Sequence, residues 1–93
     1  MVNQVRAQHI LVKTEKEAQN LLEELKKGAS FERLAQLHSL CPSGKRGGDL
    51  GYFGRGQMVR PFELAAFQLD NGQVSEPVKT EFGWHLVKVI DKK

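Results

Sequence analysis

The sequence predicts a single α+β domain, residues 1–93, in which a four-stranded sheet is wrapped by three to four helices. β-Branched, apolar segments lie near both ends of the chain. Amphipathic segments with helical spacing lie between them and are separated by glycine-rich turns. The expected order of elements is βαααβαββ. With 93 residues, of which 40% are hydrophobic, the chain has room for one modest core and one small site.

The first strand is expected over residues 5–13, a β-branched and apolar segment. Alternation places Ala7 and His9 on one face and Ile10 and Val12 on the other. Because apolar residues occupy both faces, this strand is predicted to lie in the middle of the sheet.

Two helices are expected next. The first begins at the capping box of residues 14–17 and ends at Gly28, and the second begins at Ser30. Pro42 stops further helix soon after. The apolar positions of the longer helix recur at helical spacing and are Ala18, Leu21, Leu22 and Leu25. The two helices can therefore cover one face of the sheet.

Six of the nine glycines lie in residues 42–57, so most of this stretch is expected to form turns around a short strand over residues 50–53. A long loop in a small domain is usually functional. Pro61 suits the first turn of a third helix, which ends before the turn at residues 70–72.

The last part of the chain predicts two strands. Residues 74–80 contain Pro77, so they are expected to form an edge strand or its approach. Residues 84–90 alternate, with His85, Val87 and Val89 on one face, and form the final strand.

Charge and composition limit the classes of function. The net charge is +3, but the 14 basic residues are spread along the chain, so nucleic-acid binding is not favoured. One cysteine excludes an intrachain disulfide and fits a reducing compartment. No secretory leader and no apolar run of membrane-spanning length is present. We therefore expect a cytoplasmic monomer with no membrane contact, although a domain excised from a longer exported protein would look the same.

Two histidines in expected strands are the most informative residues. A buried neutral imidazole must satisfy one ring donor and one ring acceptor. His9 and His85 lie in strands that are able to pair, so they indicate one shared polar site in an apolar wall.

Other chemistries fit the sequence less well. His9, His38, Cys41 and His85 lack the short paired spacings of structural zinc sites, so no metal is predicted. Cys41 is expected just after a helix, where it lacks the helix dipole that activates a nucleophilic thiol. The glycine-rich stretch matches neither the phosphate-binding nor the dinucleotide pattern, so no cofactor is predicted. What remains is an apolar pocket.

Six segments, in this order, resemble the signature blocks of parvulin-type peptidyl-prolyl cis–trans isomerases: HILVK at 9–13, GDLGYF at 48–53, RGQM at 55–58, PFE at 61–63, AF at 66–67 and FGWH at 82–85. CPSGKRGGD at 41–49 resembles the short stand-alone bacterial parvulins in particular. The resemblance implies the FKBP-like superfold, with an antiparallel four-stranded sheet.

The resemblance also assigns roles by position. His9 and His85 match the paired histidines at the base of the family's site, Thr80 a threonine linked to that pair, and Cys41 a cysteine beside the scaffold loop. Further positions match residues that form or flank the proline pocket: Leu50, Phe53, Gln57, Met58, Phe62 and Phe82. The remaining question is whether the histidines and the cysteine take part in catalysis or chiefly stabilise the sheet.

A non-covalent prolyl isomerase that assists protein folding is the function this resemblance implies. Its partners would be proline-containing peptides and unfolded protein segments. Phosphate-directed relatives insert an arginine-bearing loop after the position of Lys13 and some carry a serine where this chain has Phe82. We therefore expect a preference for a hydrophobic or uncharged residue before proline, not for phosphoserine or phosphothreonine.

Two other functions are compared with this one. A binding module would hold proline segments without turning them over, and would have lost Met58, Phe62 or the histidine pair, all of which are present. Weak nucleic-acid association through Lys45, Arg46 and Arg55 would depend strongly on salt.

Overall fold

One antiparallel sheet organises the computed structural model, which describes residues 2–93 and leaves Met1 of the predicted domain outside. Its spatial strand order is β2-β1-β4-β3, and its strands are β1 (Gln4–Val12), β2 (Asp49–Gly54), β3 (Val78–Thr80) and β4 (Gly83–Lys92). β1 and β4 are thus central, and they pair along nearly their whole length. The predicted α+β fold with four antiparallel strands is confirmed.

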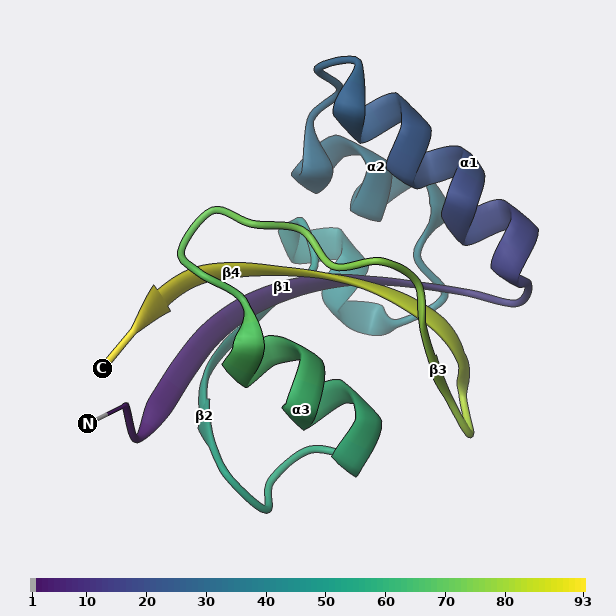
Figure 1. Cartoon of the computed structure of the whole chain (residues 1–93). Helices are drawn as coiled ribbons and strands as arrows, with labels where there is room; N and C mark the ends of the chain where they lie inside the picture. The colour runs from purple at the N-terminus through teal and green to yellow at the C-terminus, as the bar shows by residue number, and fades with distance from the viewer. Residues whose placement is uncertain (1) are drawn as a thin grey trace.

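Helices α1 (Glu15–Lys26) and α2 (Phe31–His38) cover one face of the sheet (Figure 1). Both begin as predicted, because the Thr14 and Ser30 hydroxyls each accept a backbone N–H three residues further on, at 3.2 Å. Their apolar sides form one half of the core with the sheet residues that face them: Ile10, Val12, Ala18, Leu21, Leu22, Phe31, Leu34, Ala35 and Leu86.

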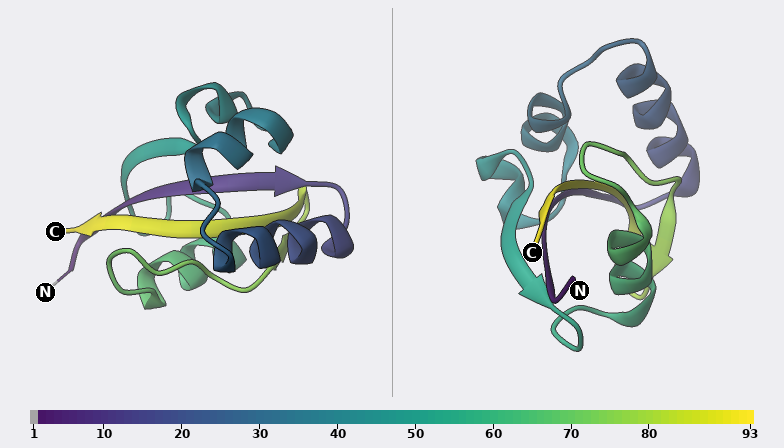
Figure 2. Two further views of the ribbon diagram at one scale, coloured as in Figure 1. Left: turned by 90° about the horizontal axis from the view of Figure 1, so that it is seen from above. Right: turned by 60° about the vertical axis from the view of Figure 1, so that its left-hand side comes forward.

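Helix α3 (Arg60–Gln68) covers the opposite face of the sheet. Figure 2 shows it across the curved sheet from α1 and α2. Pro61 lies in its first turn, where a missing N–H costs nothing. The second half of the core lies beneath α3 and consists of Val5, Ala7, Phe53, Phe62, Ala66, Val87 and Val89. Residues of β1 thus enter both halves of the core, as expected for a strand covered on two sides.

The stretch expected to form mostly turns around a short strand also contains a 3-10 helix, η1 (Pro42–Arg46). The prediction that Pro42 stops further helix is wrong, because Pro42 occupies the first turn of η1. Its fixed φ is compatible with a helical first turn, and its missing N–H needs no partner there. Gly47 then ends η1 with a left-handed backbone, φ 71°.

The edge strand next to β4 is shorter than the segment predicted for it, residues 74–80. Only Val78–Thr80 forms the strand β3, and Val74 makes an isolated bridge to Lys88. Pro77, which has no backbone N–H, separates the two paired regions. β3 is therefore the edge strand, and its last residue, Thr80, is buried against the site.

The two ends of the chain lie side by side (Figure 1). The backbone N–H groups of Asn3 and Gln4 donate to the Lys93 carbonyl at 2.8 and 2.7 Å. The chain ends are thus at the Gln4–Lys92 end of the central strand pair, away from the end where Val12 pairs with Trp84. Within residues 2–93, no helix has the length and apolar character needed to cross a membrane.

Candidate active site

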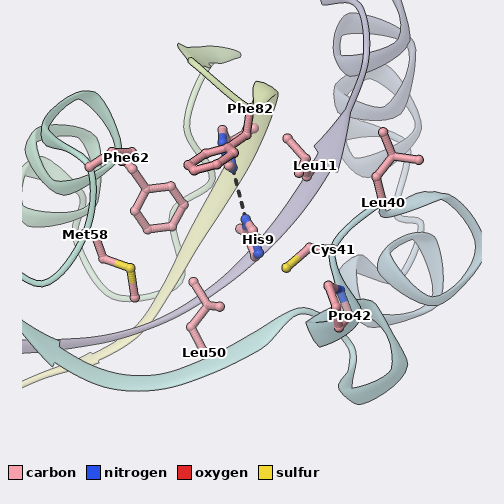
Figure 3. A pocket seen from close by; sticks show the side chains of 11 residues that line it. His9, Leu11, Leu40, Cys41, Pro42, Leu50, Met58, Phe62 and Phe82 are labelled. Atoms are coloured by element: carbon pink, nitrogen blue, oxygen red, sulfur yellow. Dashed lines mark hydrogen bonds between the residues drawn. The ribbon is translucent and has the colours of Figure 1, made fainter.

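An apolar cavity of about 390 Å³ opens on the α3 face of the sheet (Figure 3). Its walls come from β1, from the connection between α2 and η1, from β2, from the start of α3, and from the β3–β4 turn. The lining residues are His9, Leu11, Leu40, Cys41, Pro42, Leu50, Met58, Val59, Phe62, Phe82 and His85. A cavity of this size with mainly hydrophobic walls is suited to a compact apolar group.

The paired strands bring the two histidines together. In the β1–β4 ladder, His9 lies opposite Val87 and Leu11 lies opposite His85, so the histidines are diagonal neighbours on one face. Their Nδ1 atoms are 3.0 Å apart, and their ring planes differ by only 18°. The predicted shared site of two strand histidines is therefore present, joined edge to edge by a hydrogen bond.

A chain of hydrogen bonds extends from both sides of this pair. His85 Nε2 lies 2.8 Å from the Thr80 hydroxyl, and His9 Nε2 lies 3.1 Å from the Ser43 hydroxyl. Ser43 in turn donates to Cys41 Sγ at 3.4 Å. All four ring nitrogens thus have a partner, and the network ends at the one thiol of the protein.

The network has a preferred direction. The Phe82 N–H donates to Thr80 Oγ1 at 3.1 Å, so the Thr80 hydroxyl hydrogen is satisfied within the network only if it points to His85 Nε2. His85 then donates from Nδ1 to His9, and His9 donates from Nε2 to Ser43. Ser43 is left to donate to Cys41, which agrees with the geometry at that end.

Burial keeps both imidazoles neutral. It lowers the pKa of His9 from 6.5 to about 4, and the neighbouring His85 ring adds to this effect. Burial alone lowers the pKa of His85 to about 4. Both side chains are buried, with 5% and 4% of their surface exposed. At neutral pH the pair is therefore an uncharged polar floor.

Aromatic contacts attach this floor to α3. Phe62 packs edge-on against both imidazoles. Its ring centroid lies 5.5 Å from that of His9 and 5.3 Å from that of His85. Phe53 supports Phe62 from the core, at 5.9 Å between centroids. Phe53 is itself 2% exposed and does not line the cavity. Its position is therefore beneath the site.

The loop before α3 positions Met58. The Gln57 side chain accepts the Gly54 N–H at 2.8 Å, and Glu63 accepts the Gly56 N–H at 2.5 Å. Gly56 has a φ of 86°, which favours glycine. Gln57 is exposed and lies outside the cavity lining, so its role in the structure is to close the turn that leads to Met58.

The connection between α2 and η1 forms the wall opposite α3. The Leu40 N–H donates to the Leu11 carbonyl at 2.8 Å, and the Leu11 N–H donates to Ser39 Oγ at 3.1 Å. The sequence places Cys41 only behind a helix, but in the structure Cys41 is also the N-cap of η1 and makes no side-chain cap hydrogen bond. Figure 3 shows its sulfur directed towards the pocket beside His9.

The cavity brings together most, but not all, of the predicted site residues. The predicted residues that line the cavity are His9, Cys41, Leu50, Met58, Phe62, Phe82 and His85. Thr80 lies behind His85 and contacts it directly. Lining residues that were not predicted are Leu11, Leu40, Pro42 and Val59, and Ser43 was not predicted as a partner of His9. Ser43 contacts His9 across 34 residues of sequence, so no local pattern marks it.

The site offers binding and polarity but little acid–base chemistry. Because every ring nitrogen of the pair is engaged, neither histidine can take a proton from a bound molecule without breaking the network. Within residues 2–93, no three His, Cys, Asp or Glu side chains are grouped to hold a metal ion. An apolar ring can bind here while a polar group beside it stays near Cys41 and the entrance.

A four-stranded antiparallel sheet wrapped by helices, with an apolar cavity above two neutral histidines, is the arrangement that the parvulin resemblance implies. Comparison with known proteins specifies the class further: the chain belongs to the rotamase family with a PPIC-type PPIase domain, which it matches over residues 5–91. The resemblance seen in the sequence is thereby confirmed.

Relatives from bacteria and archaea support the assignment. Foldase protein PrsA of Geobacillus sp. (strain WCH70) is 53% identical over 90 residues, which are 96% of this chain and 33% of that protein. The crystal structure of peptidylprolyl isomerase (PrsA) from Bacillus anthracis has a TM-score of 0.97 at 45% identity, over 99% of this chain and 43% of that one. The solution structure of NmPin, the parvulin of Nitrosopumilus maritimus, has a TM-score of 0.87 at 48% identity, over 96% of this chain and 97% of that one. The chain spans about a third of the length of the curated relatives it matches.

Proposed function

We propose that this domain accelerates cis–trans rotation of X–Pro bonds in unfolded protein segments, without a covalent intermediate, and thereby assists folding. The observation that carries the proposal is the apolar cavity of about 390 Å³ above a neutral histidine pair. Its walls fit the pyrrolidine ring, and its floor carries no charge at neutral pH.

Rotation of an X–Pro bond is slow because amide resonance must be lost, a barrier of about 18–20 kcal/mol. A site that binds the twisted amide better than either planar form lowers this barrier. Leu50, Met58 and Phe62 would hold the ring in a poorly hydrated place. There the twisted amide, which is less polar, loses less by leaving water than the planar amide does.

Cys41 would give the rotating carbonyl a weak polar contact. Ser43 donates to the Cys41 sulfur, so the thiol's own hydrogen is left for the cavity side. The carbonyl of the residue before proline would turn past this thiol while the ring stays fixed. In this mechanism the histidines shape and support the floor and exchange no proton with the substrate.

The entrance to the cavity favours an uncharged residue before proline. Phe82 and Leu40 are 63% and 55% exposed, and together with Leu11 they form an apolar rim. Neither lysine nor arginine is among the residues that line the cavity. A phosphoserine dianion would need several converging donors, which this rim does not supply. We therefore propose a preference for hydrophobic or uncharged residues at this position.

A cis–trans exchange assay on peptides of the form X–Pro tests the proposal, with X as Phe, Leu, Ala, Glu and phosphoserine. We expect kcat/KM to be highest for Phe and Leu and lowest for phosphoserine. If no peptide is accelerated, the isomerase function is rejected. If phosphoserine is turned over fastest, the activity stands and the proposed preference is rejected.

A proline-limited refolding reaction extends the test to protein substrates. A protein whose slow refolding phase reflects prolyl isomerisation should refold faster with catalytic amounts of this domain. The rate should rise in proportion to enzyme concentration, and the final yield should not change. A higher yield with an unchanged rate would instead indicate a binding module that holds the chain without turning it over.

A further inference from the structure

A second cavity, of about 330 Å³, adjoins the proline pocket. The two cavities share three lining residues, Leu40, Cys41 and Pro42, which form a ridge between them. Beyond this ridge the lining becomes more polar and consists of Gln36, Ser39, Gly44 and Lys45. The second cavity therefore lies next to the proline pocket, at the end of α2 and beside η1.

Lys45 supplies the charge of this second cavity. It lies in the last turn of η1, is exposed, and forms no salt bridge among residues 2–93. Asp49, four residues further along the chain, is paired with Arg6 at 2.7 Å. Glu32, which packs under Gly47, makes no ion pair with Lys45. The ammonium group is thus available to a ligand that enters the cavity.

We propose that this second cavity binds an acidic side chain of the substrate, two residues before the proline. The inference rests on the proposed function, because it takes the proline ring to fill the first cavity and the carbonyl before the proline to lie beside Cys41. In an extended segment, residues two apart lie on the same side and about 7 Å apart along the chain. The residue two before proline therefore faces the protein on the far side of the ridge.

The cavity lining fits a carboxylate better than other occupants. Lys45 provides the opposite charge, and Gln36 and Ser39 provide neutral hydrogen-bond donors. A hydrophobic side chain would leave these groups without water or a partner, and a lysine would be repelled. One ammonium group is a point charge and does not form the multi-donor clamp that selects a phosphate. The preferred substrate is thus an acidic residue, then a hydrophobic residue, then proline.

The test compares three peptides that carry Phe before proline and differ only one position earlier, with Glu, Ala or Lys. The exchange assay gives kcat/KM for each. For an exposed ion pair we expect the wild-type protein to prefer Glu over Lys by about threefold. Lys45→Glu should invert this ratio, and the preference of the wild-type protein should fade between about 20 mM and 500 mM salt.

Lys16→Glu is the matched control. It makes the same charge change on an exposed residue of the first turn of α1, outside both cavities, and should keep the Glu preference. A direct readout is the amide NMR signals of Ser39 and Gly44, which should shift with the Glu peptide more than with the Ala peptide.

The outcomes separate this inference from the proposed function. Acceleration of all three peptides at equal rates overturns the acidic subsite and leaves the isomerase activity standing. A Glu preference that survives in Lys45→Glu also overturns it, because the selecting charge then lies elsewhere. Absence of any acceleration rejects the isomerase function itself.

Discussion

The chemistry of each histidine in this site is limited by its partners. Ser43 is hydrogen-bonded to His9 Nε2, Thr80 is hydrogen-bonded to His85 Nε2, and the two Nδ1 atoms are hydrogen-bonded to each other. A buried hydrogen-bond network that is fully satisfied is rigid and costly to break. The histidines therefore serve best as fixed parts of the binding surface, and Phe62 lies against both of their edges.

Replacement of His9 by alanine tests whether the pair has a role beyond stability. The change leaves a cavity and removes the partner of Ser43 and of His85 Nδ1, so we expect a loss of about 2–4 kcal/mol in the free energy of unfolding. Urea unfolding measures this loss, and kcat/KM is measured where the variant is still folded. An activity that falls only as the folded fraction falls assigns the pair a structural role alone.

Met58 provides a cleaner test of the apolar grip because it is only half-buried and packs at the edge of the core. Met58→Ala should lower kcat/KM about tenfold, the effect of losing roughly half of a buried methionine contact in the transition state. Leu64→Ala is the control, since Leu64 is 42% exposed on α3 and outside the cavity. Equal losses in the two variants would contradict a specific role for Met58.

Substitutions of Cys41 test whether its thiol is a weak polar contact or a nucleophile. As a weak hydrogen-bond partner, it should tolerate Cys41→Ser with kcat/KM within about twofold, and Cys41→Ala should cost up to about fivefold. A nucleophilic thiol would lose several orders of magnitude in both variants. The exchange assay with a Phe–Pro peptide measures the rates. A large loss in both variants would reject the non-covalent mechanism.

The elements differ in how well the sequence predicts them. The start of α1 is predictable because Thr14 and Glu17 have the spacing of a capping box, and the Thr14 hydroxyl indeed accepts the Glu17 N–H. β1 is predictable because its apolar residues occupy both faces. η1 was not predictable from periodicity, since its five residues include a proline and a glycine. Ser43 and Leu40 enter the site through contacts with β1, which follow from tertiary packing and leave no local pattern in the sequence.

The approach of β2 to β1 depends on one glycine. A Cβ atom at Gly48 would lie 2.3 Å from the His9 carbonyl oxygen, and the His9 N–H donates to the Gly48 carbonyl at 3.0 Å. No side chain fits between the segment that starts β2 and the strand that carries His9. The backbone position of the histidine pair is therefore set from this neighbouring segment.

Gly48→Ala should consequently destabilise the fold and displace His9. Gly51→Ala is the matched control, because Gly51 also has a positive φ, 70° against 86°, but nothing lies within 4 Å of its Cβ position. In the control, the free energy of unfolding should fall only by the cost of the backbone strain, about 1–2 kcal/mol, and the activity should be kept. Gly48→Ala should lose more than about 3 kcal/mol. Equal losses in urea unfolding would contradict a steric role for the contact with His9.

At the scale of the whole molecule, the pocket and the chain ends lie at different ends of the central strand pair. Asn3 pairs with Lys93, whereas His85 pairs with Leu11 near the other end of the ladder. Segments joined to either terminus would therefore start away from the cavity entrance. The PrsA foldase of Geobacillus sp. (strain WCH70), by comparison, is about three times as long as the region that this chain matches.

The two buried histidines also give the whole molecule a defined response to acid. In the unfolded chain each ring binds a proton near pH 6.5, but in the folded protein burial delays this to about pH 4. Between these values the unfolded state binds more protons, so the free energy of unfolding falls as pH decreases. Each ring lowers the free energy of unfolding by on the order of 3 kcal/mol. This loss is absent above about pH 7 and nearly complete at about pH 4.

Urea unfolding at intervals from pH 7.5 to 4.5 measures this loss. The carboxylates of Asp49 and Asp91 have lowered pKa values because they bind Arg6 and Tyr52, so they titrate below this window. The fall between about pH 6.5 and 4.5 therefore reports the histidines, and NMR titration of their ring protons gives the two midpoints directly. Midpoints near 6.5 in the folded protein would contradict a neutral, buried pair, since such values require rings that stay in contact with water.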